Sequence, residues 1–205
     1  MIDPEYWSGD AGALDAALAL YRSSFERSRI PDERVRALLA EGRYRLALVC
    51  GEDGAIHALA LVARFPEERF AHLDYLATAE TVRRQGHATR LVRWLVDGLK
   101  ADGLDELTLE TDDPLVAFYE ARGARRLVGL PYLFPAAKHG PMPMHLMAWT
   151  PDGRAEMERA RAATIVKALY CGIHGRKDPD PVLGWILARI PASVPLVGEK
   201  PGASS

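Results

Sequence analysis

The chain has 205 residues, of which 48% are hydrophobic and 26% are charged, and its formal net charge is −2 at pH 7. These are ordinary globular proportions, and the length suits one α/β domain or one domain with an added segment. The near-neutral charge gives no global attraction to nucleic acid or to an anionic membrane surface. We therefore expect no nucleic acid and no membrane among its partners.

The N-terminal residues lack the basic and apolar regions of a signal peptide, and no stretch approaches the roughly 18 apolar residues of a membrane span. The two cysteines, Cys50 and Cys171, do not form the pattern of a disulfide framework. Together these features predict a soluble, cytoplasmic protein.

Two helices are predicted first, over residues 11–27 and about 30–41. Asp10 is placed to cap the first helix, and a proline followed by acidic residues is typical of the start of the second. Strands then follow over residues 44–50, 55–64 and 70–78, with an Asp-Gly turn between the first two. We expect these three strands to form an antiparallel meander.

The strongest helical pattern covers residues 86–100, where apolar residues recur at intervals of three and four. It is followed by a buried strand over residues 107–111, a helix from Pro114 to Gly123, and strands over 124–130 and 144–149. A loop rich in proline and aromatic residues, 131–143, separates the last two strands. This order predicts an α/β fold with a mixed sheet, antiparallel at first and with a parallel crossover near its middle.

The pattern changes after Pro151, where helices are predicted over residues 155–170 and 181–190 and the tail from Pro195 looks frayed. We therefore divide the chain into a domain of residues 1–150 and a C-terminal helical extension of residues 151–205. The apolar stripe of the extension needs a partner. That partner is either a sheet edge or a second subunit, so a homodimer is possible.

The segment Arg83-Arg84-Gln85-Gly86-His87-Ala88-Thr89 joins a predicted strand to the start of the amphipathic helix. A helix N-terminus presents unpaired N–H groups and the positive end of the helix dipole, which suit a phosphate. Gly86 and Ala88 keep the backbone accessible, the two arginines add positive charge, and Thr89 adds a hydroxyl. The residues alone predict an anion site suited to a diphosphate, with a plain strand–turn–helix as the alternative.

This segment resembles the acetyl-CoA signature of the GNAT acyltransferase superfamily, Arg/Gln-x-x-Gly-x-Gly/Ala, with Arg83, Gly86 and Ala88 at its defined positions. Residues 112–124 are similar to a second element of the family, Asn-x-x-Ala-x-x-x-Tyr-x-x-x-Gly-Phe. Tyr119 and Gly123 match that element. Asp112 stands in place of the asparagine, and leucine and alanine replace the alanine and the phenylalanine. The resemblance covers roughly residues 10–150.

The resemblance implies a GNAT fold and an N-acetyltransferase that moves the acetyl group of acetyl-CoA directly to a primary amine of a small molecule or peptide. It implies that backbone at Leu76, Ala77 and Thr78 pairs with the pantetheine arm. It also implies that the pyrophosphate binds the loop from Arg83 to Thr89, and that Asp112 takes the place of a cofactor contact.

Tyr119 matches the position of the family's general acid, and a phenol keeps its proton at neutral pH. The alternative for Tyr119 is a core aromatic beside Phe118. His72 stands where protein-lysine acetyltransferases of the superfamily carry a glutamate base, and alternation places Asp74 on the same strand face. Either side chain could take the proton of the amine, or the two could be structural.

The histidines do not fall into metal-ligand spacing, so no metal is predicted. Tyr132, Phe134, Lys138 and His139 lie in the loop that would border the acceptor, but their mixture of aromatic and charged groups does not choose among amines. Two other functions stay open: a catalytically inactive CoA-binding sensor or regulatory module, and a nucleotide-binding structural protein. A tyrosine at the acid position favours the enzyme over the inactive module.

Overall fold

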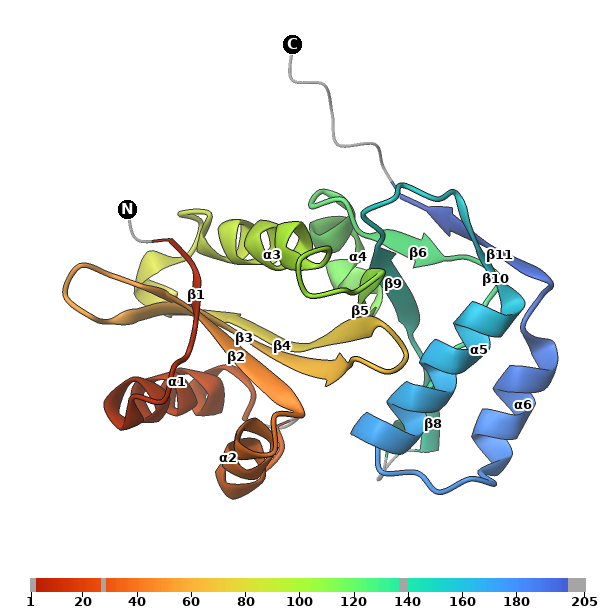
Figure 1. The fold of residues 1–205 in the computed structure, drawn as a ribbon, viewed down its shortest axis with the longest axis horizontal. Helices are drawn as coiled ribbons and strands as arrows, with labels where there is room; N and C mark the ends of the chain where they lie inside the picture. The colour runs from red at the N-terminus through yellow and green to blue at the C-terminus, as the bar shows by residue number, and fades with distance from the viewer. Residues whose placement is uncertain (1–2, 27–28, 137–139, 199–205) are drawn as a thin grey trace, which may run out of the picture. The chain divides into compact units, whose positions relative to one another are not determined.

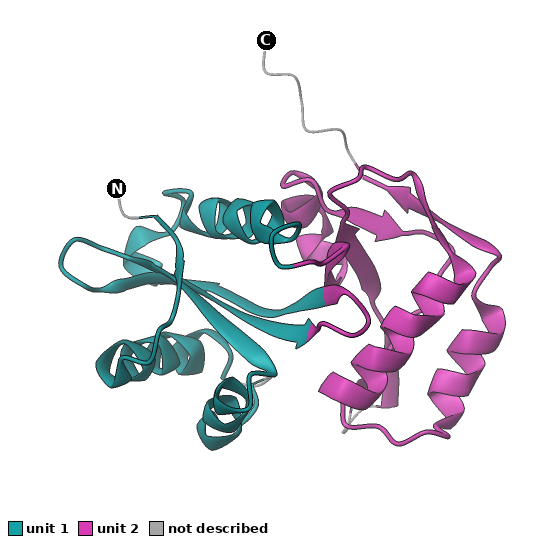
Figure 2. Cartoon of the chain, viewed as in Figure 1, with its two compact units in different colours: residues 1–64, 71–102 teal, residues 65–70, 103–205 magenta. Residues whose placement is uncertain are grey.

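The computed structural model describes residues 3–26, 29–136 and 140–198. The chain forms two compact units, drawn in different colours in Figure 2. Unit 1 consists of Met1–Arg64 and Ala71–Asp102, and unit 2 consists of Phe65–Phe70 and Gly103–Ser205. Unit 2 is therefore discontinuous in sequence, because it includes the turn between two strands of unit 1.

The described residues of unit 1 form four strands and three α-helices. In chain order its elements are β1 (Glu5–Tyr6), α1 (Ala11–Ser24), α2 (Asp32–Ala40), β2 (Tyr44–Cys50), β3 (Ile56–Phe65), β4 (Phe70–Thr78), the 3-10 turn η1 (Glu80–Val82) and α3 (His87–Gly98). The strand order is β1-β2-β3-β4, with β1 and β3 both antiparallel to β2. Figure 1 shows α1 and α2 on one side of these strands and α3 on the other.

The predicted helical patterns of unit 1 are confirmed by burial. The Asp10 side chain caps α1 by accepting from the backbone N–H of Ala13 at 2.6 Å. The buried residues of α1 are those of the apolar pattern: Leu14, Ala17, Leu18 and Tyr21. In α3, Leu91, Val92 and Leu95 are likewise buried. Each helix therefore uses its apolar stripe to cover the sheet.

Unit 2 contains a second group of strands and the remaining helices. Its elements are β5 (Glu106–Thr111), α4 (Asp113–Glu120), β6 (Arg125–Leu127), β7 (Leu133–Ala136), β8 (Gly140–Pro143), β9 (His145–Trp149), β10 (Glu156–Glu158), α5 (Arg159–Ala168), the π-helix η2 (Leu169–Ile173), α6 (Pro181–Arg189) and β11 (Ser193–Val197). Five strands run in the order β5-β9-β6-β11-β10, all neighbours antiparallel, and β7 pairs with β8 in a separate hairpin.

The two faces of strand β9 carry different parts of unit 2. Leu146 and Ala148 belong to the buried cluster that includes the apolar residues of α5 and α6. Because side chains alternate along a strand, Trp149 points to the opposite face. There its indole Nε1 donates to the carbonyl of Arg122 at 2.8 Å, at the end of α4. Helix α4 and the pair α5–α6 therefore cover opposite faces of this sheet.

A buried charge pair fastens α5 to the rest of unit 2. Arg161 Nε on α5 lies 2.6 Å from Glu106 Oε1 on β5, and the Glu106 side chain is fully buried. The same guanidinium donates to the carbonyls of Glu68 and Arg69 at 2.5 and 3.3 Å. A buried carboxylate without such partners would be costly, so this pair links α5 to β5.

Three sequence predictions need correction. The segment after residue 150 is not only helical, because β10 and β11 both join the sheet and α5 begins at Arg159. The tail from Pro195 is not frayed as far as Val197, since β11 pairs with β6 and with β10. The loop 131–143 contains the hairpin β7–β8. In both regions prolines weaken the strand pattern, and pairing with distant strands supplies what local sequence lacks.

The expected mixed α/β class is confirmed. Among the helices of the described residues, none has the length and apolar character needed to cross a membrane. Residues 151–198 belong to the same compact unit as β5, α4 and β9.

Candidate active site

The loop between β4 and α3 presents an open helix start. Gly86 is the N-cap of α3 with φ +83°, and a Cβ built there would meet no heavy atom within 4 Å. Among the described residues no side chain caps this helix, and its first turn carries no acidic residue. The backbone N–H groups at the start of α3 are thus accessible to an anion, as a diphosphate requires.

The residues before Gly86 add positive charge and a sharp turn. Arg83, Arg84 and Gln85 are all exposed. Arg84 adopts φ +65°, a left-handed conformation that is uncommon outside glycine. Arg83 Nη1 lies 3.7 Å from Glu80 Oε1, and an ion pair between two side chains as exposed as these is weak. Both guanidinium groups are therefore open to solvent and add positive charge beside the start of α3.

His87 contributes its backbone to the helix start, while its side chain lines a pocket of about 400 Å³ with Cys50, Asp53, His57 and Arg90. The rings of His87 and His57 lie 4.8 Å apart. Burial, and then the neighbouring His57 and Arg90, lower the pKa of His87. Its Nε2 has no hydrogen-bond partner within the described part of the chain. This histidine pairing had no sequence signal, because the two residues lie on different elements.

Strand β4 carries the two residues expected to act as base. His72 is buried, with 1% of its surface exposed, whereas Asp74 is half-buried. Asp74 Oδ2 accepts the hydrogen of the Tyr44 hydroxyl at 2.6 Å. Burial and the charge of Asp74 raise the pKa of Tyr44, so this phenol stays a donor. Asp74 is thus the more accessible of the two.

The end of β4 leads directly to the loop. Ala77 is buried there, whereas Leu76 and Thr78 are half-buried. The backbone N–H of Ala79 donates to the carbonyl of His57 at 2.9 Å, which fixes the point where the chain leaves the sheet. Unit 1 therefore holds His72, Asp74, residues 76–78 and the loop 83–89 on one strand–loop–helix segment.

Tyr119 and Asp112 belong to unit 2, on α4 and at its N-cap. The Tyr119 ring is half-buried, at 5.0 Å from the Phe118 ring and 6.1 Å from that of Trp149. Burial raises the pKa of Tyr119, and the nearby Arg122 partly opposes this. The phenol therefore keeps its proton well above neutral pH. Asp112 is exposed and makes no capping hydrogen bond.

A buried polar cluster in unit 2 has no local sequence motif. Glu110 Oε1 accepts the hydrogen of the Tyr132 hydroxyl and lies 2.9 Å from His174 Nε2. The sequence does show a carboxylate, Glu110, within a strand that is predicted to be buried. A buried carboxylate of this kind requires a hydrogen-bond partner. That partner is 64 residues away in sequence, so the strand pattern does not identify it.

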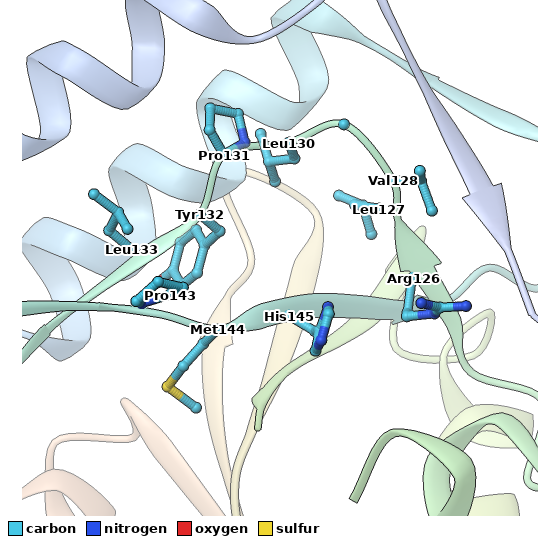
Figure 3. Close-up of a pocket in the computed structure, with 11 residues that line it drawn as sticks. Arg126, Leu127, Val128, Leu130, Pro131, Tyr132, Leu133, Pro143, Met144 and His145 are labelled. Carbon is cyan, nitrogen blue, oxygen red and sulfur yellow. The ribbon is translucent and has the colours of Figure 1, made fainter. Parts of the chain in front are cut away.

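A pocket of about 440 Å³ lies beside this cluster, between residues 126–133 and 143–145 (Figure 3). Tyr132 is one of its walls. Two other residues expected near the acceptor, Lys138 and His139, lie outside the described residues. Over residues 3–26, 29–136 and 140–198, no group of three or more His, Cys, Asp or Glu side chains is placed to hold a metal ion.

Comparison with known proteins gives concordant results. Residues 14–124 match the acetyltransferase (GNAT) family. An aminoglycoside N(6')-acetyltransferase type 1 of Serratia marcescens is 35% identical over 112 residues, covering 50% of this chain and 77% of the relative.

Solved structures share the fold. The aminoglycoside 6'-N-acetyltransferase of Enterococcus faecium has a TM-score of 0.59 at 18% identity, covering 73% of this chain and 97% of that one. An aminoglycoside 6'-N-acetyltransferase complexed with coenzyme A has a TM-score of 0.60 at 17% identity, with the same coverage of 73% and 97%. Tetrahymena GCN5 has a TM-score of 0.57 at 14% identity, covering 73% and 96%.

Proposed function

Since the chain belongs to the acetyltransferase (GNAT) family, and is therefore an acetyl-CoA-dependent N-acetyltransferase, we propose that it acetylates a primary amine of a small molecule. The structural observation that supports acetyl-CoA as the acetyl donor is the uncapped start of α3 at Gly86, where an open backbone and two exposed arginines suit a diphosphate. These features support binding of the coenzyme A diphosphate at the start of α3.

Binding of the cofactor is assigned to the strand–loop–helix segment of unit 1. The backbone at the end of β4, Leu76 to Thr78, is proposed to pair with the pantetheine arm. The N–H groups of the loop and first turn, from Arg83 to Thr89, are proposed to hold the pyrophosphate, with Arg83 and Arg84 neutralising its charge. When bound, acetyl-CoA supplies a thioester whose carbonyl carbon the amine attacks.

Tyr119 is proposed to donate its proton to the departing thiolate. Its raised pKa supports this role, because a general acid must hold its proton until the transfer. The charge of Arg122, which follows α4, lowers the pKa of Tyr119 and partly opposes the effect of burial. Asp112, the N-cap residue of α4, is proposed to make a further contact with the cofactor.

Asp74 is proposed as the base in preference to His72. An ammonium must lose a proton before it can attack, and the accepting group has to be reachable by substrate or by water. Asp74 is half-buried and oriented by the Tyr44 hydroxyl at 2.6 Å, whereas His72 is buried. His72 then serves to position β4.

The acceptor is proposed to be a small molecule because the relative from Serratia marcescens is named for an aminoglycoside. The test is an acetyl-CoA consumption assay over a panel of aminoglycosides, arylalkylamines and peptide N-termini, with product mass measured. Formation of an acetylated amine supports the proposal. Tight binding of coenzyme A without turnover on any amine would instead identify a CoA-binding sensor.

A further inference from the structure

The C-terminal segment contributes a π-helix, η2 (Leu169–Ile173), to unit 2. Such helices are rare, and where they occur they are often found at functional sites. Here the π-helix directs Tyr170 and the following His174 toward residues 132–134, at the start of the hairpin β7–β8. The family match covers residues 14–124 and so does not include this C-terminal segment. The contacts join the segment to the rest of unit 2.

Glu110 is the centre of these contacts. Its Oε1 accepts from the Tyr132 hydroxyl and lies 2.9 Å from His174 Nε2, and the Glu110 and His174 side chains are only 7% and 9% exposed. Burying a carboxylate is costly unless hydrogen bonds compensate for lost water. The carboxylate therefore fixes the positions of Tyr132 and His174 relative to each other.

Two more contacts fasten the neighbouring residues. The ring of His174 meets that of Phe134 edge-on, with centroids 4.9 Å apart. The Tyr170 hydroxyl donates to the carbonyl of Leu133. The C-terminal segment thus holds three consecutive residues, Tyr132 to Phe134.

Tyr132 and Leu133 form one wall of the pocket in Figure 3, where the loop after β6 arches away from β9. The pocket volume of about 440 Å³ suits a small molecule or part of one. Its lining is mostly apolar: Leu127, Val128, Leu130, Pro131, Leu133, Pro143 and Met144.

Arg126 and His145, which line this pocket, each already have a carboxylate partner. Arg126 Nε lies 2.8 Å from Glu120 Oε1, and His145 Nε2 lies 2.6 Å from Asp113 Oδ1. Both carboxylates belong to α4, the helix that carries Tyr119. None of the described residues that line the pocket has a carboxylate, so the lining favours burial of apolar surface over capture of a cation.

We propose that this pocket receives a compact, largely apolar part of the acceptor, and that His174, acting through Glu110 and Tyr132, positions its wall. The proposal rests on the proposed N-acetyltransferase function and adds the chemistry of the substrate. His174 is a positioning residue, and residues 169–174 become part of acceptor recognition.

The test compares 2-phenylethylamine with the aminoglycoside kanamycin as acceptors. For the wild type we expect the KM for 2-phenylethylamine to be at least about ten-fold lower than the KM for kanamycin. The apolar lining favours burial of the phenyl ring, and none of the described lining residues offers a carboxylate to the cationic groups of kanamycin. His174→Ala should raise the KM for 2-phenylethylamine about ten-fold while kcat and the KM for acetyl-CoA change less than about two-fold. His174→Gln, which can keep a donor near Nε2, should restore most of the lost affinity.

Two further variants keep the test decisive if His174→Ala does not fold. Val128 lines the pocket and is 42% exposed, so Val128→Trp should fill the pocket at little cost in stability and raise the same KM. Trp185→Ala, at a 41% exposed position on α6, is the matched control and should change neither KM.

The outcomes separate this inference from the proposed function. If the wild type acetylates amines but His174→Ala and Val128→Trp leave the acceptor KM unchanged, the pocket assignment is wrong and the acetyltransferase proposal stands. A lower KM for kanamycin than for 2-phenylethylamine also overturns the assignment. If no amine is acetylated, binding of 2-phenylethylamine measured by calorimetry decides: weaker binding to Val128→Trp than to the wild type supports the pocket, and equal binding refutes it.

Discussion

At Tyr119, the neighbouring side chains set the pKa of the phenol. Burial against Phe118 and Trp149 raises its pKa, and Arg122 partly opposes that rise. A general acid works only while it is protonated, and its activity falls as pH rises through its pKa. The raised pKa therefore moves this fall to higher pH than for a free tyrosine, which titrates near pH ~10.

Replacing Tyr119 with phenylalanine should lower kcat about a hundred-fold or more, because that is the usual scale of general acid catalysis. Affinity for coenzyme A should stay within about two-fold, since the ring remains in place. Steady-state kinetics from pH 6 to 10.5 and calorimetry would measure both effects. Loss of coenzyme A binding together with kcat would mean that Tyr119 is a packing residue.

Asp74 and His72 can be separated by a second pair of substitutions. Asp74→Asn should reduce kcat/KM for the amine about a hundred-fold, because the amide cannot accept the proton. His72→Gln should reduce it less than about five-fold. Tyr44→Phe, which removes the 2.6 Å hydrogen bond to Asp74 but keeps the ring, should fall between the two. A larger loss in His72→Gln than in Asp74→Asn would assign the base to His72.

At the level of single elements, the start of α3 is the part of the site most open to a clean test. Gly86 and Gly42 both have left-handed backbone, with φ +83° and +68°, and a Cβ added at either residue would meet no heavy atom within 4 Å. Alanine at either position costs about 1 kcal/mol of backbone strain. Any difference between the two variants in cofactor binding therefore reports on the helix start.

Gly86→Asp should weaken coenzyme A binding more than about ten-fold, because it places negative charge where the pyrophosphate is expected. Gly86→Ala should weaken binding by only a few-fold. Gly42→Ala is the control, with a similar drop in thermal stability and unchanged affinity. Isothermal titration calorimetry with each purified variant gives the comparison, and equal affinities for Gly86→Asp and the wild type would move the cofactor elsewhere.

The elements also show what local sequence can and cannot predict. Helix α3 and strand β2 are predictable nearly residue by residue, since apolar spacing and strand length are local properties. The hairpin β7–β8 and strand β11 are not, because prolines interrupt them and the partners of β11 are distant. The role of His174 is also not predictable from local sequence, because its partner Glu110 lies 64 residues earlier. The loop and Tyr119 lie in short motifs and need no such information.

On the scale of the whole molecule, the residues after 150 are an integral part of unit 2. Strand β11 lies between β6 and β10, and α5 and α6 contribute many of the apolar residues of the buried cluster. Arg161 also supplies the charge that compensates the fully buried Glu106. That the family domain ends at residue 150 stays a prediction. We do not expect the chain to fold stably when it is divided there.

A chain of residues 1–150 should therefore be insoluble or bind the dye ANS as a loosely packed state, because it exposes the apolar face and leaves Glu106 unpaired. A chain of residues 1–198, which keeps every described element, is the control and should unfold cooperatively like the full protein. If the 1–150 chain is soluble and unfolds cooperatively, as monitored by near-UV circular dichroism, the extension is dispensable for folding.

The pairing of Glu106 with Arg161 sets an order of events during synthesis. Glu106 leaves the ribosome 55 residues before its partner, and until then its carboxylate must stay in water. We therefore expect β5 to reach its buried position only after α5 has been synthesised, and we expect α5 and β5 to acquire hydrogen-exchange protection together rather than in chain order. The unfinished chain would carry an exposed apolar strand through this interval, which is when we expect it to depend most on chaperones.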